Sequence, residues 1–282
     1  MTGDAVTGDA DEARERLEIE LLLEGIQRLY GYDFRGYALA SLRRRLWHRV
    51  YGEGLATISG LQERILHDPS CMDRLLRDLS INVTEMFRDP SFHRALRTHV
   101  FPLLRTYPFI RVWNAGCSTG EEIYSVAIAL REEGLLERAR IYATDIDETA
   151  LQRARSGAFS LERMQLYTEN YQRAGGTESF SSYYNADGDV ARFDPALAAG
   201  TVFAQHNLVT DGSFNEFQLI ICRNVLIYFG AELQEKVLGL FGASLTRLGI
   251  LALGRKESLR HSRHAAQYEP LVESEKIFRR VA

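Results

Sequence analysis

A short run of small residues, GCSTG at positions 116–120, offers the first residue types in this chain that could do chemistry. It stands between an apolar segment, FIRVWNAG, and a segment with helical character, GEEIYSVAIALREEG. The pattern G-x-S-x-G matches a hydrolase nucleophile elbow, in which Ser118 needs an acid such as Asp145 and then a histidine. The later histidines are His206, His261 and His264. None directly follows a predicted late core strand, so the hydrolase is the weaker hypothesis.

The helix after this turn opens with two carboxylates, Glu121 and Glu122. They suit the positive end of a helix dipole but repel a phosphate, and the turn lacks the dinucleotide pattern G-x-G-x-x-G. The next apolar segment ends in Asp145, which is placed to accept hydrogen bonds from ribose hydroxyls, while Asp147 is the better cap for the following helix. A cofactor with a ribose and positive charge, but no phosphate at the turn, fits both observations. S-adenosylmethionine has these properties.

The elements that precede the turn are helical by periodicity. Gly31 ends the first predicted helix, and Asp89 with Pro90 forms a start signal for the last one, in which Asp89 is the cap. The segment LASLRRRLWHRVYG predicts a second helix that carries an arginine run. The predicted boundaries are a disordered acidic tail at 1–14, a helical N-terminal domain at 15–88 and a linker helix at 89–107.

From residue 108 to residue 282, apolar strand segments alternate with helical segments, which predicts an α/β domain with a parallel sheet and right-handed crossovers. Residues 160–202 are rich in Ser, Tyr, Gly and Asn and too long for one crossover, so they predict a small inserted antiparallel β-subdomain. The segment 230–249 predicts one helix. A strand, ILALG, and a terminal hairpin follow it.

Composition excludes other classes of protein. The net charge of −4 argues against a nucleic-acid binder, and no apolar run approaches the roughly 18 residues that a membrane span needs. Three cysteines, Cys71, Cys117 and Cys222, are odd in number and share no C-x-x-C spacing, which excludes a disulfide framework and argues against a metal site. The N-terminus has no apolar core of a signal peptide, so we expect a cytoplasmic protein.

Five motifs, NVTEMFRDPSF, WNAGCSTGEEIYS, ATDID, HNL and CRNVLIYF, resemble in order and spacing the CheR chemotaxis receptor methyltransferases. The resemblance runs from about residue 15 to the end of the chain. It implies an S-adenosylmethionine-dependent protein-glutamate O-methyltransferase, whose cofactor product is S-adenosylhomocysteine. It also implies an all-α N-terminal domain followed by a Rossmann-like methyltransferase domain that bears a small β-subdomain.

The family's cofactor contacts, carried onto this sequence, fall in all five motifs. They are Asn82, Thr84, Arg88, Ala115, Gly116, Glu122, Asp145, Asn207, Leu208, Arg223 and Asn224. Two departures stand out. Met86 replaces the first of two phenylalanines that are common in the family, and LGRKES, with Arg255 and Lys256, replaces the common LG-H-S-E. The second change alters the charge at that rim of the site.

The chemistry implied by the resemblance suits these residues. A glutamate acceptor is already ionised at neutral pH, with a reference pKa of about 4.3, so it needs no general base. It needs donors that position a carboxylate, and the candidates for these catalytic residues are Arg88, Arg223 and Tyr228. A nitrogen acceptor usually meets a proline-containing loop at this strand end, and CRNVLIYF has no proline.

The expected partner is the helical bundle of a chemoreceptor. The basic helix with Arg43, Arg44, Arg45 and Arg49 could dock on its acidic methylation region, and the β-subdomain could pair with a tethering peptide. A solvated helix face is the ordinary meaning of such a run. Two alternatives stay open: a methyltransferase for another protein or small-molecule acceptor, and a cofactor-binding signalling module with little turnover.

Overall fold

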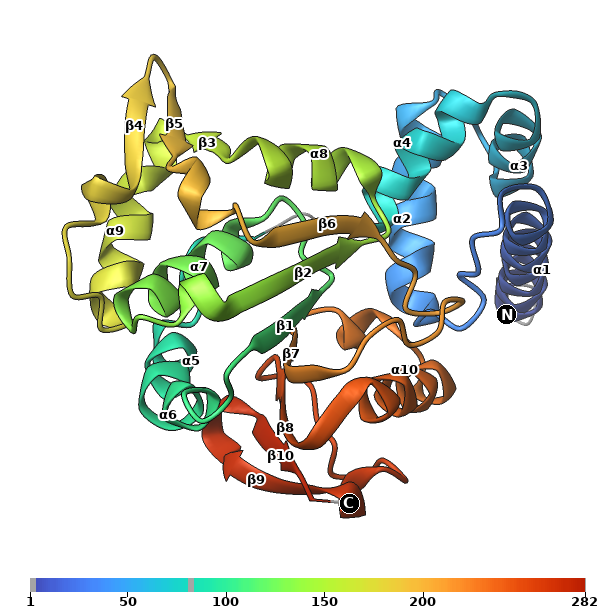
Figure 1. Cartoon of the computed structure of the whole chain (residues 1–282). Coiled ribbons are helices and arrows are strands. Elements are labelled where there is room, and N and C mark those ends of the chain that lie inside the picture. Colours follow the sequence, from blue (N-terminus) through green and yellow to red (C-terminus); the bar gives the residue numbers. More distant parts are fainter. Residues whose placement is uncertain (1–3, 81–83, 282) are drawn as a thin grey trace. The chain divides into compact units, whose positions relative to one another are not determined.

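The computed structural model describes residues 4–80 and 84–281, and the chain forms two compact units. The first unit contains the described residues up to 80 together with the later segment Tyr228–Leu233. The second unit contains Ile227 and the residues before it, back to the start of the second described range, and Gln234 onward. Figure 1 shows the helices of the first unit from blue to cyan and the sheet of the second unit from green to red.

The first unit begins with a long helix, α1 (Asp4–Tyr30). The prediction of a disordered tail over 1–14 is therefore wrong for the described residues from Asp4 onward. Charged side chains at helical spacing, such as Arg16 and Glu20 at 3.2 Å, support the helix locally. Gly31 ends it as predicted: its φ is +77°, and its N–H donates to the carbonyl oxygen of Gln27 at 3.0 Å.

Three shorter helices complete this unit: α2 (Leu39–Gly52), α3 (Ile58–His67) and α4 (Pro69–Leu79). The segment Tyr228–Leu233 is bonded into them. The N–H of Gly230 donates to the carbonyl of Gly36 at 2.7 Å, and the ring of Phe229 lies 5.0 Å from that of Tyr37. Within the described ranges, no helix combines the length and the apolar character that a bilayer crossing demands.

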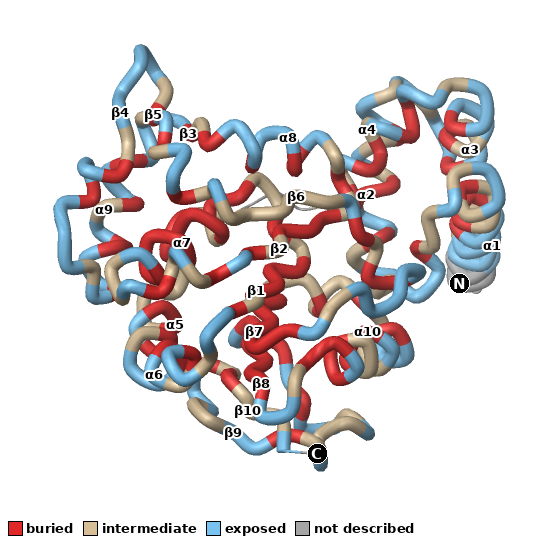
Figure 2. Tube along the Cα trace, in the orientation of Figure 1, coloured by how far each residue is buried: buried red, intermediate tan, exposed pale blue. Residues whose placement is uncertain are grey.

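The second unit is built on a seven-stranded sheet with the order β6-β2-β1-β7-β8-β10-β9. Its strands are β1 (Ile110–Ala115), β2 (Ala139–Asp145), β6 (Thr201–Gln205), β7 (Phe217–Cys222), β8 (Leu245–Leu253), β9 (Tyr268–Val272) and β10 (Ile277–Arg280). The four pairings from β6 to β8 join parallel strands, and the predicted terminal hairpin of β9 and β10 is confirmed. All six residues of β7 are buried, as a central parallel strand requires (Figure 2).

The main helices of the second unit alternate with the strands. They are α7 (Glu121–Glu132), α8 (Glu148–Ser156), α9 (Met164–Arg173) and α10 (Ala231–Ser244). The prediction of a helix that continues to residue 249 is wrong, because β8 begins at Leu245. Leu245 is needed in the sheet, where it lies opposite Phe217, and the register shifts just after this pair.

The predicted helix at 89–107 divides into α5 (Pro90–Ala95), a π-helical stretch at Leu96–Val100 and α6 (Phe101–Leu104). Pro102 has no N–H to continue the helical ladder, which accounts for the irregularity. Phe92, Leu96 and Phe101 are fully buried in the core of the second unit. This segment is therefore part of that unit rather than a linker.

The inserted β-subdomain is present as a three-stranded antiparallel sheet with the order β3-β5-β4. Its strands are β3 (Ala158–Ser160), β4 (Tyr184–Asp187) and β5 (Val190–Phe193). Three of the four residues of β4 are exposed, and this strand lies at the edge of the small sheet.

Candidate active site

The predicted cofactor residues gather where the parallel strands end. Ala115 ends β1, Asp145 ends β2, and Asn207 and Arg223 follow the ends of β6 and β7. These four strands are neighbours in the sheet, in the order β6-β2-β1-β7. The chain runs outward from β1 to β2 on one side and later returns to β7 on the other, so this edge holds a topological switch point, where open α/β sheets bind ligands.

The glycine turn after β1 depends on close backbone approach. Gly116 has a φ of +78°, and a Cβ atom there would lie 2.5 Å from Cγ2 of Val225. Gly120 has a φ of +98°, and its Cβ would lie 2.8 Å from Cβ of Ala154. Only glycine fits either position without strain, and a backbone without side chains lines the edge of the sheet.

Asp145 fastens this turn to the end of β2. Its Oδ2 accepts the N–H of Ser118 at 2.8 Å, and its Oδ1 accepts the N–H of Asp147 at 3.0 Å. Burial raises the pKa of Asp145. Each oxygen keeps a second lone pair for a hydroxyl donor. Asp147 caps α8 as predicted, since its side chain accepts the N–H groups of Thr149 and Ala150.

The two glutamates after the turn have different surroundings. Glu121 is buried beside Thr119, and burial raises its pKa. Glu122 accepts a hydrogen bond from Nδ2 of Asn114 at 2.9 Å and forms an ion pair with Nη1 of Arg223 at 2.7 Å. The charge of Glu122 is therefore already paired with Arg223, so this glutamate by itself does not require the cationic ligand that the sequence suggested.

Arg223 joins three elements of the second unit. Its side chain is 2% exposed, and it pairs with Glu122 of α7 and with Asp89 just before α5. Its Nη1 also donates to the carbonyl oxygen of Arg88 at 3.3 Å, and its guanidinium carbon lies 4.0 Å from the ring centre of Phe92. A buried guanidinium with two carboxylate partners holds the elements that carry them in place and is not available to bind a substrate.

The turn that contains Arg88 has a strained backbone. Phe87 and Asp89, on either side of it, have φ values of 52° and 56°, in a region that residues other than glycine rarely adopt. The hydroxyl of Ser125 accepts the Phe87 N–H at 2.8 Å, and Arg223 binds the Asp89 carboxylate. Asp89 does not cap α5 with its side chain, contrary to the prediction, because that carboxylate is used by Arg223. Strain held by surrounding contacts is typical of functional positions.

Glu257 is a site residue that sequence reasoning missed. It is 4% exposed, and its carboxylate accepts the N–H groups of Val225 at 2.9 Å and Leu226 at 2.8 Å, as well as that of Gly254. Burial raises its pKa, while these backbone donors act against the shift. It holds the loop after β7, in which Asn224 has a φ of 62°. The available signal was an acid shortly after the last core strand, inside LGRKES.

The remaining predicted contacts have mixed positions. Asn207 forms a turn after β6, where its Oδ1 accepts the Val209 N–H at 2.9 Å, and Leu208 in the same turn is buried. The carbonyl oxygen of Thr84 accepts a hydrogen bond from Arg163 at 3.0 Å. Asn82 lies outside the described residues.

Tyr228 belongs to the first unit, whereas the other described candidate residues belong to the second unit. The guanidinium of Arg45 lies 4.5 Å from its ring centre. Its backbone oxygen accepts the N–H of Ala38 at 2.9 Å. These contacts favour a structural role over the catalytic one expected from the sequence.

The histidine and cysteines that the sequence singled out, His206, Cys117 and Cys222, are buried in the structure. His206 packs edge-on against Trp113 at 5.3 Å between ring centres, and its Nε2 lies 3.1 Å from the carbonyl oxygen of Gly212. Burial raises the pKa of Cys117 and of Cys222 well above the ordinary thiol value. Both sulfur groups are packing groups here, and His206 has structural contacts rather than those of a triad base.

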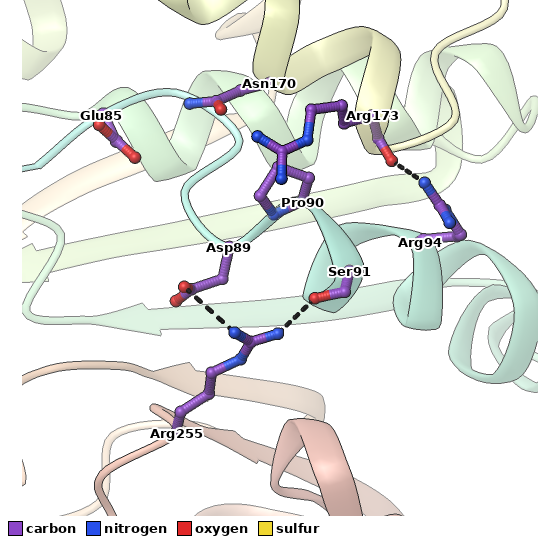
Figure 3. Close-up of a pocket in the computed structure, with 8 residues that line it drawn as sticks. All are labelled: Glu85, Asp89, Pro90, Ser91, Arg94, Asn170, Arg173 and Arg255. Atoms are coloured by element: carbon purple, nitrogen blue, oxygen red, sulfur yellow. Dashed lines mark hydrogen bonds and ion pairs between the residues drawn. The ribbon is translucent and has the colours of Figure 1, made fainter.

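A polar pocket of about 420 Å³ lies beside the strained turn, within the second unit (Figure 3). Its lining residues are Glu85, Asp89, Pro90, Ser91, Arg94, Asn170, Arg173 and Arg255. Arg255, where the chain departs from the common family pattern, forms an ion pair with Glu275 at 3.0 Å and approaches Asp89 at 3.9 Å. The changed rim of the site is thus a wall of this pocket.

The residues at the sheet edge fit the expected cofactor. The turn at Gly116 offers bare backbone at the switch point, and Asp145 offers carboxylate oxygens at the end of the neighbouring strand. The edge carries carboxylates at the start of α7, where phosphate-binding sites have free N–H groups. These features suit a ribose and an uncharged or cationic methionine moiety.

Comparison with known proteins gives matches over most of the chain. Residues 82–274 match the family model described as the CheR methyltransferase, SAM binding domain, and residues 17–80 match the CheR methyltransferase, all-alpha domain. The chain is 52% identical over 269 residues to Cher3 of Pseudomonas putida, which is named as a candidate methyltransferase, covering 95% of this chain and 98% of that one. It is 30% identical over 236 residues to a chemotaxis protein methyltransferase of Listeria innocua, covering 83% and 87%. A crystal structure of a SAM-dependent methyltransferase from Geobacter sulfurreducens with S-adenosyl-L-homocysteine is 16% identical, with a TM-score of 0.33, covering 58% and 47%.

Proposed function

Because this chain belongs to the CheR methyltransferase family and has that family's S-adenosylmethionine-binding domain, we propose that it methylates glutamate side chains of chemotaxis receptors. The products are glutamate methyl esters and S-adenosylhomocysteine. The observation that carries the proposal is the strained turn around Arg88, which the buried Arg223 holds against the end of β7.

The chemistry asks little of the protein in proton transfer. When bound, the cofactor supplies an electrophilic methyl group on a sulfonium. A glutamate carboxylate is ionised at neutral pH and forms the new C–O bond as the C–S bond breaks, so no general base is needed. In this proposal Arg88 orients the carboxylate. Arg223 donates to the backbone oxygen of Arg88 and so supports its turn, and Glu257 holds the loop after β7. In this proposal Arg223 and Glu257 are positioning residues.

Two surfaces are proposed to meet the receptor. On α2, Arg44 is exposed, and no carboxylate among the described residues pairs with it. On the small sheet, β4 offers an exposed edge to which an extended peptide could add a strand. An Arg44→Glu variant is expected to bind the full receptor more weakly, with unchanged affinity for the cofactor.

The direct test is methyl transfer from radiolabelled cofactor to receptor preparations. Methyl esters release labelled methanol in mild alkali, whereas N-methyl groups do not. The expected result is base-labile label on the receptor fraction. Label that resists alkali would favour another acceptor, and cofactor binding without any transfer would favour a signalling module with little turnover.

Arg88→Ala tests the residue that carries the proposal. We expect turnover to fall by about 100-fold or more, because alignment of the acceptor is lost. Arg247→Ala is the matched control, since Arg247 is exposed at the start of β8, at the other end of that strand from the site. Equal turnover of the two variants would remove Arg88 from the mechanism.

A further inference from the structure

The pocket beside Arg88 has an unusual balance of charge. Its lining includes three arginines and two carboxylates, a formal charge of +1. Figure 3 shows the Arg173 side chain directed toward Pro90 and the Arg255 side chain reaching between Asp89 and Ser91, with Glu85 on the side away from Arg94.

The arginines differ in the partners that the chain already gives them. Arg255 has Glu275 and Asp89. Arg94 donates to the backbone oxygen of Arg173, which is a neutral acceptor. Arg173 itself forms no ion pair with any carboxylate that the structure describes. Neither Arg94 nor Arg173 is therefore in an ion pair with a carboxylate of the described residues, although Glu85 and Asp89 line the same pocket.

The position of the pocket limits what it can bind. Its wall includes Asp89, the residue after Arg88, and adjacent Cα atoms are about 3.8 Å apart. A volume of about 420 Å³ is within the range of ligand sites but admits side chains rather than a folded partner. On a helical substrate, side chains one turn apart are separated by roughly 5–6 Å, so one of them can occupy the pocket while another is held by Arg88.

We propose that this pocket binds the carboxylate of a second acidic residue of the substrate, one helical turn from the glutamate that is methylated. The proposal rests on the proposed function and adds a specificity site to it. Arg173 and Arg94 supply the charge, and Ser91 and Arg255 line the opposite wall. The enzyme would then select glutamates by an acidic neighbour as well as by access.

The test uses two synthetic helical peptides with one central glutamate. One peptide has glutamates four residues before and after it, and the other has glutamines there. Affinity is measured by fluorescence anisotropy and methyl transfer by label, with the full chain in both assays. Wild type is expected to bind the acidic peptide about tenfold more tightly, an effect that weakens with added salt.

Charge-reversal variants locate the effect. Arg173→Glu is expected to abolish the preference between the peptides, raising KM for the acidic peptide while kcat and cofactor affinity stay unchanged. Glu85→Gln is expected to strengthen binding of the acidic peptide about twofold, since it removes a like charge. Arg247→Glu is the matched control and is expected to keep the preference. An Arg173→Glu enzyme that keeps the wild-type preference would overturn the proposal.

Two further outcomes are decisive. In the first, inorganic phosphate is titrated alone. If phosphate binds, if Arg173→Glu removes that binding, and if the wild-type enzyme shows no preference between the peptides, the pocket binds a small anion and the proposal of a substrate carboxylate is overturned. If neither peptide is methylated, the proposed function fails for these acceptors, yet the anisotropy comparison still supports or refutes the pocket. Circular dichroism of each variant verifies that it is folded.

Discussion

Two groups of arginines in this protein make an instructive contrast. In the helical unit, α2 carries Arg43, Arg44, Arg45 and Arg49 within one short run of sequence. In the second unit, Arg94, Arg173 and Arg255 come from three distant parts of the sequence and line one pocket. The run would be chosen first as a binding surface from the sequence alone.

The run on α2 is mostly engaged inside its own unit. Arg43 pairs with Glu15 at 2.7 Å, and Arg49 pairs with Glu53 and Asp78. Arg45 is buried, and burial lowers the pKa of its guanidinium. Arg45 donates to the backbone oxygen of Leu79, whereas Arg44 is exposed and has no ion pair with a described carboxylate. The contrast teaches that an arginine with partners from its own chain serves the fold, and that one without such partners is available for recognition.

The most buried paired arginine gives the largest expected effect. Arg223→Ala would leave Glu122 without its cation and Asp89 with only the more distant Arg255, and we expect the free energy of unfolding to fall by about 3 kcal/mol. Urea unfolding of the full chain measures it. Arg131→Ala is the control, since its pair with Asp194 has side chains 48% and 39% exposed and should contribute less than about 1 kcal/mol. Equal losses in the two variants would break the contrast.

Arg45 is the next test, within α2. Arg45→Ala should lower the free energy of unfolding by about 2 kcal/mol, because it opens a cavity beside the Tyr228 ring. Arg45→Met keeps most of the volume without a buried charge and should destabilise less. Thermal unfolding separates the two variants. An equal loss with alanine and with methionine would show that the guanidinium, rather than the packing of the side chain, stabilises the helix here.

Acid should weaken the paired network of the helical unit. Hydrogen bonding by Arg74 lowers the pKa of Glu53 in the folded state. This stabilisation is therefore present above the ordinary glutamate pKa and is lost as the pH falls through the lowered folded value. We expect Glu53→Gln to cost about 1 kcal/mol at pH 7 and almost nothing near pH 3. Glu63→Gln, at an exposed position, should show no such pH dependence.

The smallest effects on stability are expected where arginines lack partners. Arg44→Ala and Arg173→Ala should each change the free energy of unfolding by less than about 0.5 kcal/mol. Their effects on binding should differ, because Arg173→Ala weakens the acidic peptide and Arg44→Ala does not. A marked loss of stability in Arg173→Ala would show that Arg173 stabilises the fold, and it would then not count among the arginines available for recognition.

The sequence predicted the strand–helix alternation and the glycine turn well, because apolar runs and Gly116 constrain the backbone locally. It could not show that Glu122 and Asp89 share Arg223, since three separate segments meet there. Glu257 was missed for the same reason. Its partners are backbone N–H groups of a loop about 30 residues earlier, which leave no mark on residue types.

The end of the helical prediction at 249 failed for a different reason. Local propensity favours a helix that continues beyond Ser244, but Leu245 pairs with Phe217 in the sheet. Similarly, the tail at 4–14 looked too polar to order, yet it belongs to one long helix. In the first case tertiary pairing overrides propensity, and in the second a short window conceals a helix whose buried residues lie further along.

The return of Tyr228–Leu233 to the helical unit has a consequence for how the protein is made. During synthesis the four N-terminal helices leave the ribosome roughly 150 residues before the segment that completes their unit, which is on the order of ten seconds at usual elongation rates. Until then, Gly36 and Tyr37 lack the bonds and ring contact that the late segment provides. The nascent helical unit therefore lacks these contacts until a segment within the sequence of the second unit has been synthesised. A product truncated before Tyr228 would not contain the complete helical unit.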